Sequence, residues 1–154
     1  MKRMRVLSLL IVCFVVILSG CIKNQPYVTT LNPSLTANIG TYDFTAVTVV
    51  PSTVDTQIHD TITGLTITGF SADQTAKNDK IILRINSYKG KTGTFSIVQS
   101  QASAQYLHSG IISTALGGIV SITHVNSNSL TGYFSFTTQD GIAVQNGTFN
   151  VGLP

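Results

Sequence analysis

Apolar and polar residues alternate with a period of two along several segments of the chain. In residues 80–87, one set of alternate positions is wholly aliphatic: Ile81, Leu83 and Ile85. The same period recurs closer to the C-terminus, at Leu130, Gly132, Phe134 and Phe136, and again at Gly147, Phe149, Val151 and Leu153. Because successive side chains of a strand point to opposite faces, this pattern predicts sheets with one buried and one solvent-facing side.

Threonine, valine, isoleucine and aromatic residues dominate from Ser34 onward, and Gly, Asn and Asp separate the apolar segments. This distribution predicts nine strands: 34–39, 41–50, 61–71, 80–87, 93–98, 103–108, 117–126, 129–138 and 142–152. The segment 99–116 is the most ambiguous part, and a helical turn is the alternative for residues 109–116. Asp140-Gly141 suits a tight hairpin, and Asn146-Gly147 suits a turn or a bulge. The predicted fold is therefore all-β: an antiparallel β-sandwich or a partly closed barrel of about nine strands.

The N-terminus has a different pattern, typical of a secretory leader. Three basic residues precede residue 6, and a run of 13 apolar or small residues, 6–18, follows. A helix of that length rises about 20 Å, which is short for a bilayer core of about 30 Å. Leu18, Ser19, Gly20 and Cys21 come next and resemble the lipobox that lipoprotein signal peptidase recognises. We therefore predict cleavage before Cys21, with diacylglycerol on its thiol and an acyl chain on its new amine; the alternative is an uncleaved membrane anchor.

Cleavage changes the charge and thiol content of the chain. Of nine Lys and Arg residues, three leave with the leader, so that six remain against six Asp and no Glu. The basic character thus belongs to the leader and gives no reason to expect a nucleic-acid partner. The chain has two cysteines; Cys13 is removed and Cys21 is modified, so the mature domain would have neither a disulfide nor a thiolate metal site.

These observations predict three parts: a signal peptide at 1–20, a lipidated tether at 21–33 and an all-β domain at 34–154. The membrane is the predicted partner, through the N-terminal diacylglyceryl and acyl chains. Ile22 stands where an Asp commonly retains enterobacterial lipoproteins in the inner membrane, which favours the outer membrane. Residues 22–27 lack the acid-rich stretch that marks many surface-exported lipoproteins, which favours the periplasmic leaflet.

Three segments of the C-terminal part carry a family resemblance: residues 118–123 (GIVSIT), 130–136 (LTGYFSF) and 144–149 (VQNGTF). They are similar to the "GxIxIT … SGTFSF … NGTF" ending of a family of small Bacteroidota lipoproteins with an all-β domain of unknown function. Residues 35–46 resemble the opening strand pair of that family, and 93–97 its middle strand. Tyr133 replaces the usual threonine. The resemblance implies an all-β lipoprotein, and the family offers no catalytic residues to carry over.

Residues able to carry chemistry are sparse. His59, His108 and His124 have no metal-ligand spacing, so no metal, cofactor or catalytic residue is predicted. The chain has no G-x-S-x-G motif of a serine hydrolase. A hydrolase activity would therefore require an Asp and a His that converge in one pocket. The leading hypothesis is a non-enzymatic envelope lipoprotein with a binding or structural role and a glycan or protein ligand not yet defined. The second hypothesis is an accessory protein that binds a glycan or small molecule at a concave face lined by tyrosines. The candidates are Tyr42, Tyr88, Tyr106 and Tyr133.

One modification site is also predicted. Asp60-Thr61-Ile62 resembles the Asp-Ser/Thr-aliphatic acceptor of protein O-glycosylation in the same bacterial phylum, which makes Thr61 a candidate O-glycosylation site. Asn146-Gly147-Thr148 fits the N-glycosylation pattern of a different secretory system and is not predicted to be modified.

Overall fold

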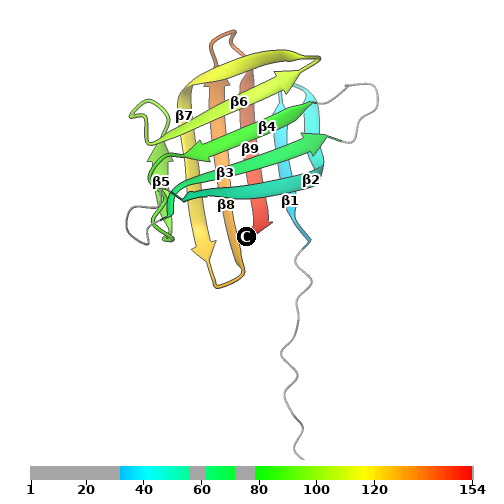
Figure 1. Ribbon diagram of the computed structural model, residues 1–154. Helices are drawn as coiled ribbons and strands as arrows, with labels where there is room; N and C mark the ends of the chain where they lie inside the picture. Colours follow the sequence, from blue (N-terminus) through cyan, green and yellow to red (C-terminus); the bar gives the residue numbers. More distant parts are fainter. Residues whose placement is uncertain (1–31, 56–61, 72–78, 154) are drawn as a thin grey trace, which may run out of the picture. The chain divides into compact units, whose positions relative to one another are not determined.

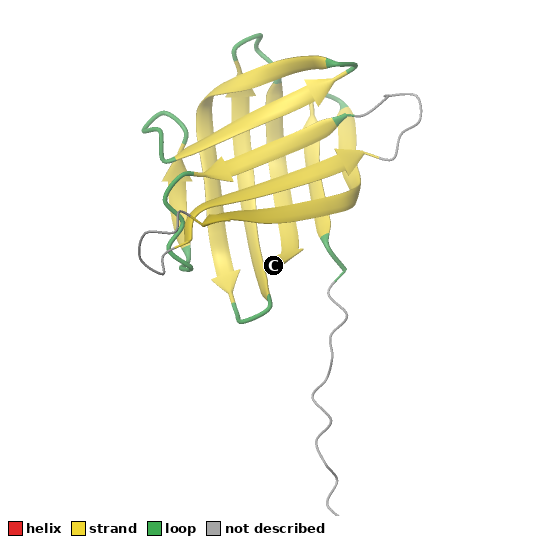
Figure 2. Cartoon of the chain, in the orientation of Figure 1, coloured by secondary structure: helices red, strands yellow, loops and turns green. Residues whose placement is uncertain are grey.

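The computed structural model describes residues 32–55, 62–71 and 79–153, and all of its regular secondary structure is β-strand (Figures 1 and 2). The chain divides into residues 1–30 and a compact unit, Leu31–Pro154. The nine strands are β1 (Ser34–Ile39), β2 (Tyr42–Asp55), β3 (Ile62–Ser71), β4 (Lys80–Ile85), β5 (Gly93–Ser96), β6 (Ala102–His108), β7 (Ile111–Val125), β8 (Ser129–Thr138) and β9 (Ala143–Gly152). Within the described ranges, no helix has the length and apolarity needed to cross a membrane.

Eight of the strands close into an antiparallel barrel. Its order is β7-β6-β4-β3-β2-β1-β9-β8, and the pairing of β8 with β7 completes the ring. Neighbours in the barrel follow one another along the chain, except that β4 pairs with β6 and β1 pairs with β9. The short β5 pairs with β7 beyond the point where β6 leaves it. Of the two predicted architectures, the barrel is therefore the one observed, and its closure leaves no open edge in the ring.

The barrel is flattened into two layers whose strands cross at a steep angle (Figure 1). We call them the β3–β4 sheet (most of β2, β3, β4, β6 and the start of β7) and the β8–β9 sheet (β1, β9, β8, β5 and the rest of β7). β2 and β7 belong to both and turn from one to the other, as strands do at the corners of orthogonal sheets. The register shifts at Ala46/Thr48 in β2 and at Ala115/Gly117 in β7 accompany these bends.

All nine predicted segments are strands in the structure, with ends that differ by a few residues. The helical turn considered for residues 109–116 is wrong, because β7 begins at Ile111 and its first four residues pair with β6. β2 continues to Asp55 instead of ending at residue 50, since β3 supplies partners along that length. Asn146 has a positive φ of 50°, and one extra residue of β9 separates the partners of Phe134 and Phe136. The Asn146-Gly147 dipeptide is therefore a bulge within β9.

The barrel interior is filled by the apolar residues that the alternation predicted. Ile81, Leu83 and Ile85 are 0–1% exposed, and the inward residues of β8 and β9 are similarly buried. Each such Leu, Ile or Phe stabilises the folded state by about 1.5–3 kcal/mol through burial. The largest fully buried side chains come from both sheets and, at Tyr88, from the loop after β4: Phe44, Leu35, Leu65, Ile67, Ile81, Leu83, Ile85, Tyr88, Val120, Ile122, Leu130 and Phe134. These side chains occupy the space between the two sheets, and the depressions described below lie on the outside of the barrel.

Candidate functional site

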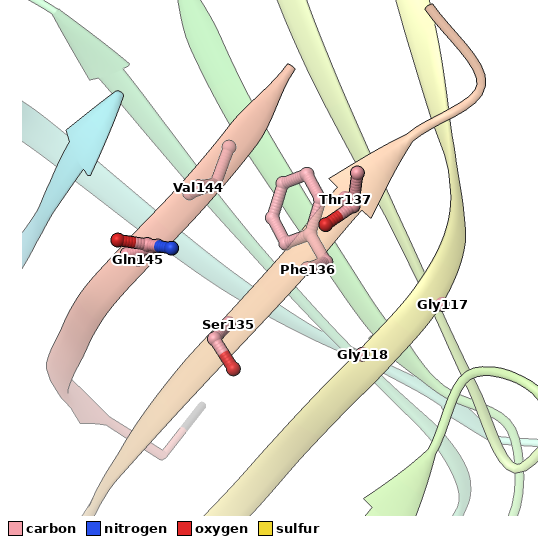
Figure 3. Close-up of a pocket in the computed structure, with 7 residues that line it drawn as sticks. All are labelled: Gly117, Gly118, Ser135, Phe136, Thr137, Val144 and Gln145. Carbon is pink, nitrogen blue, oxygen red and sulfur yellow. The ribbon is translucent and has the colours of Figure 1, made fainter. Parts of the chain in front are cut away.

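Two adjoining depressions lie on the outer face of the β8–β9 sheet and share Ser135; we call them together the outer groove. One holds about 230 Å³ and lies across three strands: Gln145 comes from β9, Ser135 and Thr137 come from β8 in the middle, and β7 contributes the bare backbone of Gly117-Gly118 (Figure 3). The other holds about 390 Å³ and is lined by Tyr133, Phe134, Ser135, Asn146, Gly147 and Thr148. The larger volume falls within the range of about 300–1,000 Å³ that is common for ligand sites.

Local sequence explains why the sheet is hollow there. Gly117 and Gly118 contribute no side chain where β7 passes β8, and Gly118 has a φ of 137°, which other residues rarely adopt. A Cβ at Gly118 would lie 2.2 Å from the carbonyl oxygen of Ser135, so the two strands can approach this closely only at glycine. On the other side of the groove, the Asn146 bulge interrupts the pleat of β9.

The polar side chains of the outer groove are hydroxyls and amides, and none of its lining residues is charged. Two of them are held by bonds to the neighbouring strand β1. The hydroxyls of Thr148 and Thr36 lie 2.9 Å apart, and Asn146 Nδ2 donates to Asn38 Oδ1 at 3.1 Å. Hydroxyls and amides both donate and accept hydrogen bonds, which matches ligands rich in hydroxyl groups. An ionic ligand would find no counter-charge in this groove.

The four tyrosines predicted as candidates for a glycan-binding face differ in their exposure to solvent. Tyr88 and Tyr106 are buried, and Tyr42 packs partly buried against the core. Tyr133 is 45% exposed on the outer face of β8, in the wall of the larger depression. This position agrees with the alternation in which Gly132 and Phe134 face inward, and Tyr133 is the member of the four that can offer a ring face to a ligand.

A second polar cluster lies where β4 begins and β6 ends. The Asp79 carboxylate is 1% exposed, and its Oδ2 lies 2.6 Å from His108 Nδ1. The Tyr106 hydroxyl donates to the same oxygen at 2.9 Å, and the Ser109 backbone N–H donates to Oδ1 at 3.3 Å. The rings of Tyr106 and His108 stack with centroids 5.9 Å apart. Burial, followed by the hydrogen bond to Asp79, raises the pKa of the Tyr106 phenol well above its ordinary value.

This cluster brings together an Asp and a His, which the sequence alone did not predict. The two residues are 29 positions apart, but they flank Lys80 and Leu107, which are partners in the β4–β6 register. The contact could not be predicted from the sequence, because the sequence does not show that β4 pairs with β6 and not with β5. The contact with Asp79 uses His108 Nδ1, and Nε2 is the other ring nitrogen of a side chain that is 55% exposed. Among described residues, the hydrogen bonds of His108 all use Nδ1.

The other predicted site residues are not tested by the fold. Leu18, Ser19, Gly20, Cys21, His59 and Thr61 lie outside the described residues. His124 is exposed on β7 and pairs with Thr131. In the part of the chain that the structure describes, no group of three His, Cys, Asp or Glu residues converges as a metal site would require. Comparison of the chain with protein-family models, with curated proteins and with solved structures found no match to any of them.

Proposed function

We propose that this chain is a lipid-anchored protein of the bacterial cell envelope, held at the outer membrane through acyl chains on Cys21. The support is the order of basic, apolar and small residues before that cysteine, together with the resemblance to small Bacteroidota lipoproteins. Ile22 after the cysteine favours the outer membrane. Three acyl chains would make the attachment effectively permanent, because each buried CH₂ contributes about 0.8 kcal/mol.

Within that setting, the domain acts as a binding module and not as an enzyme, and its ligand is a neutral glycan. The observation that carries this proposal is the outer groove: a concave, uncharged surface with hydroxyl and amide groups beside the exposed Tyr133 ring. A sugar has apolar C–H faces that stack on an aromatic ring and hydroxyl groups that exchange hydrogen bonds with amides. The packed interior of the barrel also directs ligand binding to the outside.

A hydrolase is the alternative, and the Asp79–His108 pair is the observation in its favour. A buried carboxylate that orients an exposed imidazole is the arrangement of a general base. Under this alternative, His108 Nε2 would activate water, and His108→Ala would abolish turnover of any hydrolysed glycan. Under the binding proposal, the same variant would bind oligosaccharide as the parent protein does, since His108 lies outside the outer groove.

The anchor is tested in cells that produce the full chain. Globomycin, which inhibits lipoprotein signal peptidase, is expected to cause a lipidated precursor to accumulate, and mass spectrometry of untreated protein is expected to find acyl chains on Cys21. Cys21→Ser is expected to prevent both. Normal processing in globomycin, or an unmodified Cys21 in membrane-bound protein, would refute the anchor.

Ligand binding is tested by titrating the protein with neutral oligosaccharides, such as manno-, cello- and laminari-oligosaccharides, and following the amide resonances of Ser135, Gln145 and Asn146. We expect shifts confined to the outer groove, and a loss of affinity of about tenfold in Tyr133→Ala, which corresponds to about 1.4 kcal/mol. Phe70→Ala is the matched control, because Phe70 is 37% exposed on the opposite sheet. Shifts elsewhere, or equal losses in both variants, would contradict the proposal.

A further inference from the structure

The outer face of the β3–β4 sheet differs from the outer groove in its chemistry. The strand registers place Phe70 beside Lys80, Lys80 beside Leu107, and Leu107 beside Ile112, which makes one row across four strands. The next row runs from Val50 through Thr68 and Ile82. Alternation along each strand turns these side chains away from the core, so the face presents two neighbouring rows with apolar members.

These apolar side chains are open to solvent. Ile112 is 56% exposed, Val50 46% and Phe70 37%, while Ile82 and Leu107 are half-buried by their neighbours. A face of this kind is unusual on a protein that meets only water, because scattered single apolar residues are normal but adjoining ones mark contact surfaces. The outer groove on the opposite sheet has hydroxyl and amide side chains instead.

Two basic side chains, Lys80 and Arg84, lie on the same sheet. The Lys and Arg residues of the described ranges are Lys80, Arg84, Lys89 and Lys91, which all lie on β4 or in the loop that follows it. The Lys80 ammonium stands 6.0 Å from the centroid of the Phe70 ring. Of the carboxylates whose side chains are described, Asp79 is buried and Asp43 lies at the start of β2, while Asp140 accepts a hydrogen bond from Ser113 at the β7 side of the sheet. Lys80 therefore places a positive charge within the exposed row that runs from Phe70 to Ile112.

We propose that this face docks on the anionic headgroup layer of the same bilayer that holds the acyl chains. The inference rests on the proposed anchor at Cys21, and it uses the length of chain between that residue and β1. Residues 22–33 are 12 residues, and even a fully extended chain of that length spans no more than about 40 Å. The domain therefore stays close to the membrane surface, where cationic side chains meet anionic lipid and apolar side chains enter the interface.

Because the tether is short, weak contacts between the β3–β4 sheet and the bilayer are sufficient for docking. Tethering raises the effective concentration of the face at the bilayer to the millimolar range, so docking needs little intrinsic affinity. The two sheets form opposite layers of the barrel (Figure 1). Docking by the β3–β4 sheet directs the outer groove away from the lipid, where a glycan can reach it. Docking thus gives the domain a defined orientation, with the proposed glycan site on the side away from the membrane.

The test uses full-length, processed lipoprotein in phosphatidylethanolamine–phosphatidylglycerol vesicles. Because Cys13 is removed and Cys21 is acylated, a new cysteine is the only free thiol of the mature chain and can carry a fluorophore. Thr68→Cys places the label on the β3–β4 sheet, and Thr137→Cys places it on the opposite face. We expect brominated lipids to quench the Thr68 label at least about twofold more strongly than the Thr137 label, with less difference at high salt.

The triple variant Phe70→Ser, Lys80→Ser, Arg84→Ser is expected to reduce quenching at position 68 to that at position 137. Equal quenching of the two labels in the parent protein would overturn the inference. So would self-quenching of the Thr68 label that rises with the protein-to-lipid ratio and persists in neutral detergent, because that result would mean a second copy of the chain covers the face. Failure of the anchor itself is distinguishable, since the protein would then not float with the vesicles at all.

Discussion

The ring of Phe134 lies over Gly147, its partner in the β8–β9 register, and occupies the space that a side chain at position 147 would need. A Cβ at Gly147 would stand 2.5 Å from atoms of this ring, which is itself 1% exposed and held in the core. Phe149 covers Gly132 in the same way from the other strand. The two pairs let large rings pack over bare backbone, and they fix the register of β8 against β9.

Gly147→Ala is therefore expected to destabilise the protein by about 1–3 kcal/mol, because the ring cannot move without displacing other core residues. Chemical denaturation would measure the change. Gly93→Ala is the control, since a Cβ there meets the Phe95 ring at an ordinary 3.5 Å. Adding Phe134→Leu should make Gly147→Ala less costly than it is alone. A purely additive double variant would contradict the steric explanation.

Asp79→Ala is expected to destabilise the barrel by about 2–3 kcal/mol, because it removes the carboxylate acceptor of the buried Tyr106 hydroxyl and leaves only the longer contact of 3.3 Å with His108 Nδ1. His108→Ala should change the unfolding free energy by less than about 1 kcal/mol, since that side chain is 55% exposed. Urea denaturation of the two variants at neutral pH separates the effects. Equal losses would indicate that the Asp79–His108 contact, and not the Tyr106 bond, stabilises this end of the barrel.

Stability is expected to fall in alkaline solution above about pH 10, the ordinary pKa of tyrosine. Burial raises the pKa of both Tyr106 and Tyr88 in the folded protein. The folded state then keeps protons that the unfolded chain releases, so the stabilisation present below pH 10 is lost as the pH rises towards the folded pKa. Tyr106→Phe should lessen this slope in thermal or chemical unfolding. Phe70→Ala, which removes an exposed ring and no ionisable group, should leave it unchanged, and an equal change in both would refute the assignment.

Ser113→Ala is expected to raise the pKa of the Asp140 carboxyl towards its ordinary value of 3.8. The hydrogen bonds from Ser113 and then Thr138 lower that pKa in the folded protein. Their contribution to stability is present above the unfolded pKa and is lost as the pH falls through the folded pKa. Carbon-detected NMR titration of the carboxyl would measure the shift. Thr94→Ala, which removes a hydroxyl bonded to Ser121, is the control that should leave Asp140 unchanged.

The sequence by itself determined the strands and the face of each strand that is buried. Ile81, Leu83 and Ile85 face the core as their spacing predicted, because the alternation of side chains is a local property of extended backbone. The turn at Gly141, with a φ of 82°, was also predictable, since a tight hairpin needs a residue that tolerates positive φ. The leader pattern around Cys21 likewise depends on local hydropathy and not on the fold.

Only the tertiary structure decided which strands pair and what those pairings bring together. Any strand edge offers the same backbone hydrogen-bonding groups, so alternation cannot say that β4 pairs with β6 or that β1 closes on β9. These long-range pairings create the contact between Asp79 and His108 and the outer groove around Ser135. They also place the Phe70 and Ile112 side chains in one row. Local alternation therefore determines which face of the sheet each side chain occupies. Closure of the barrel determines which residues of other strands it contacts.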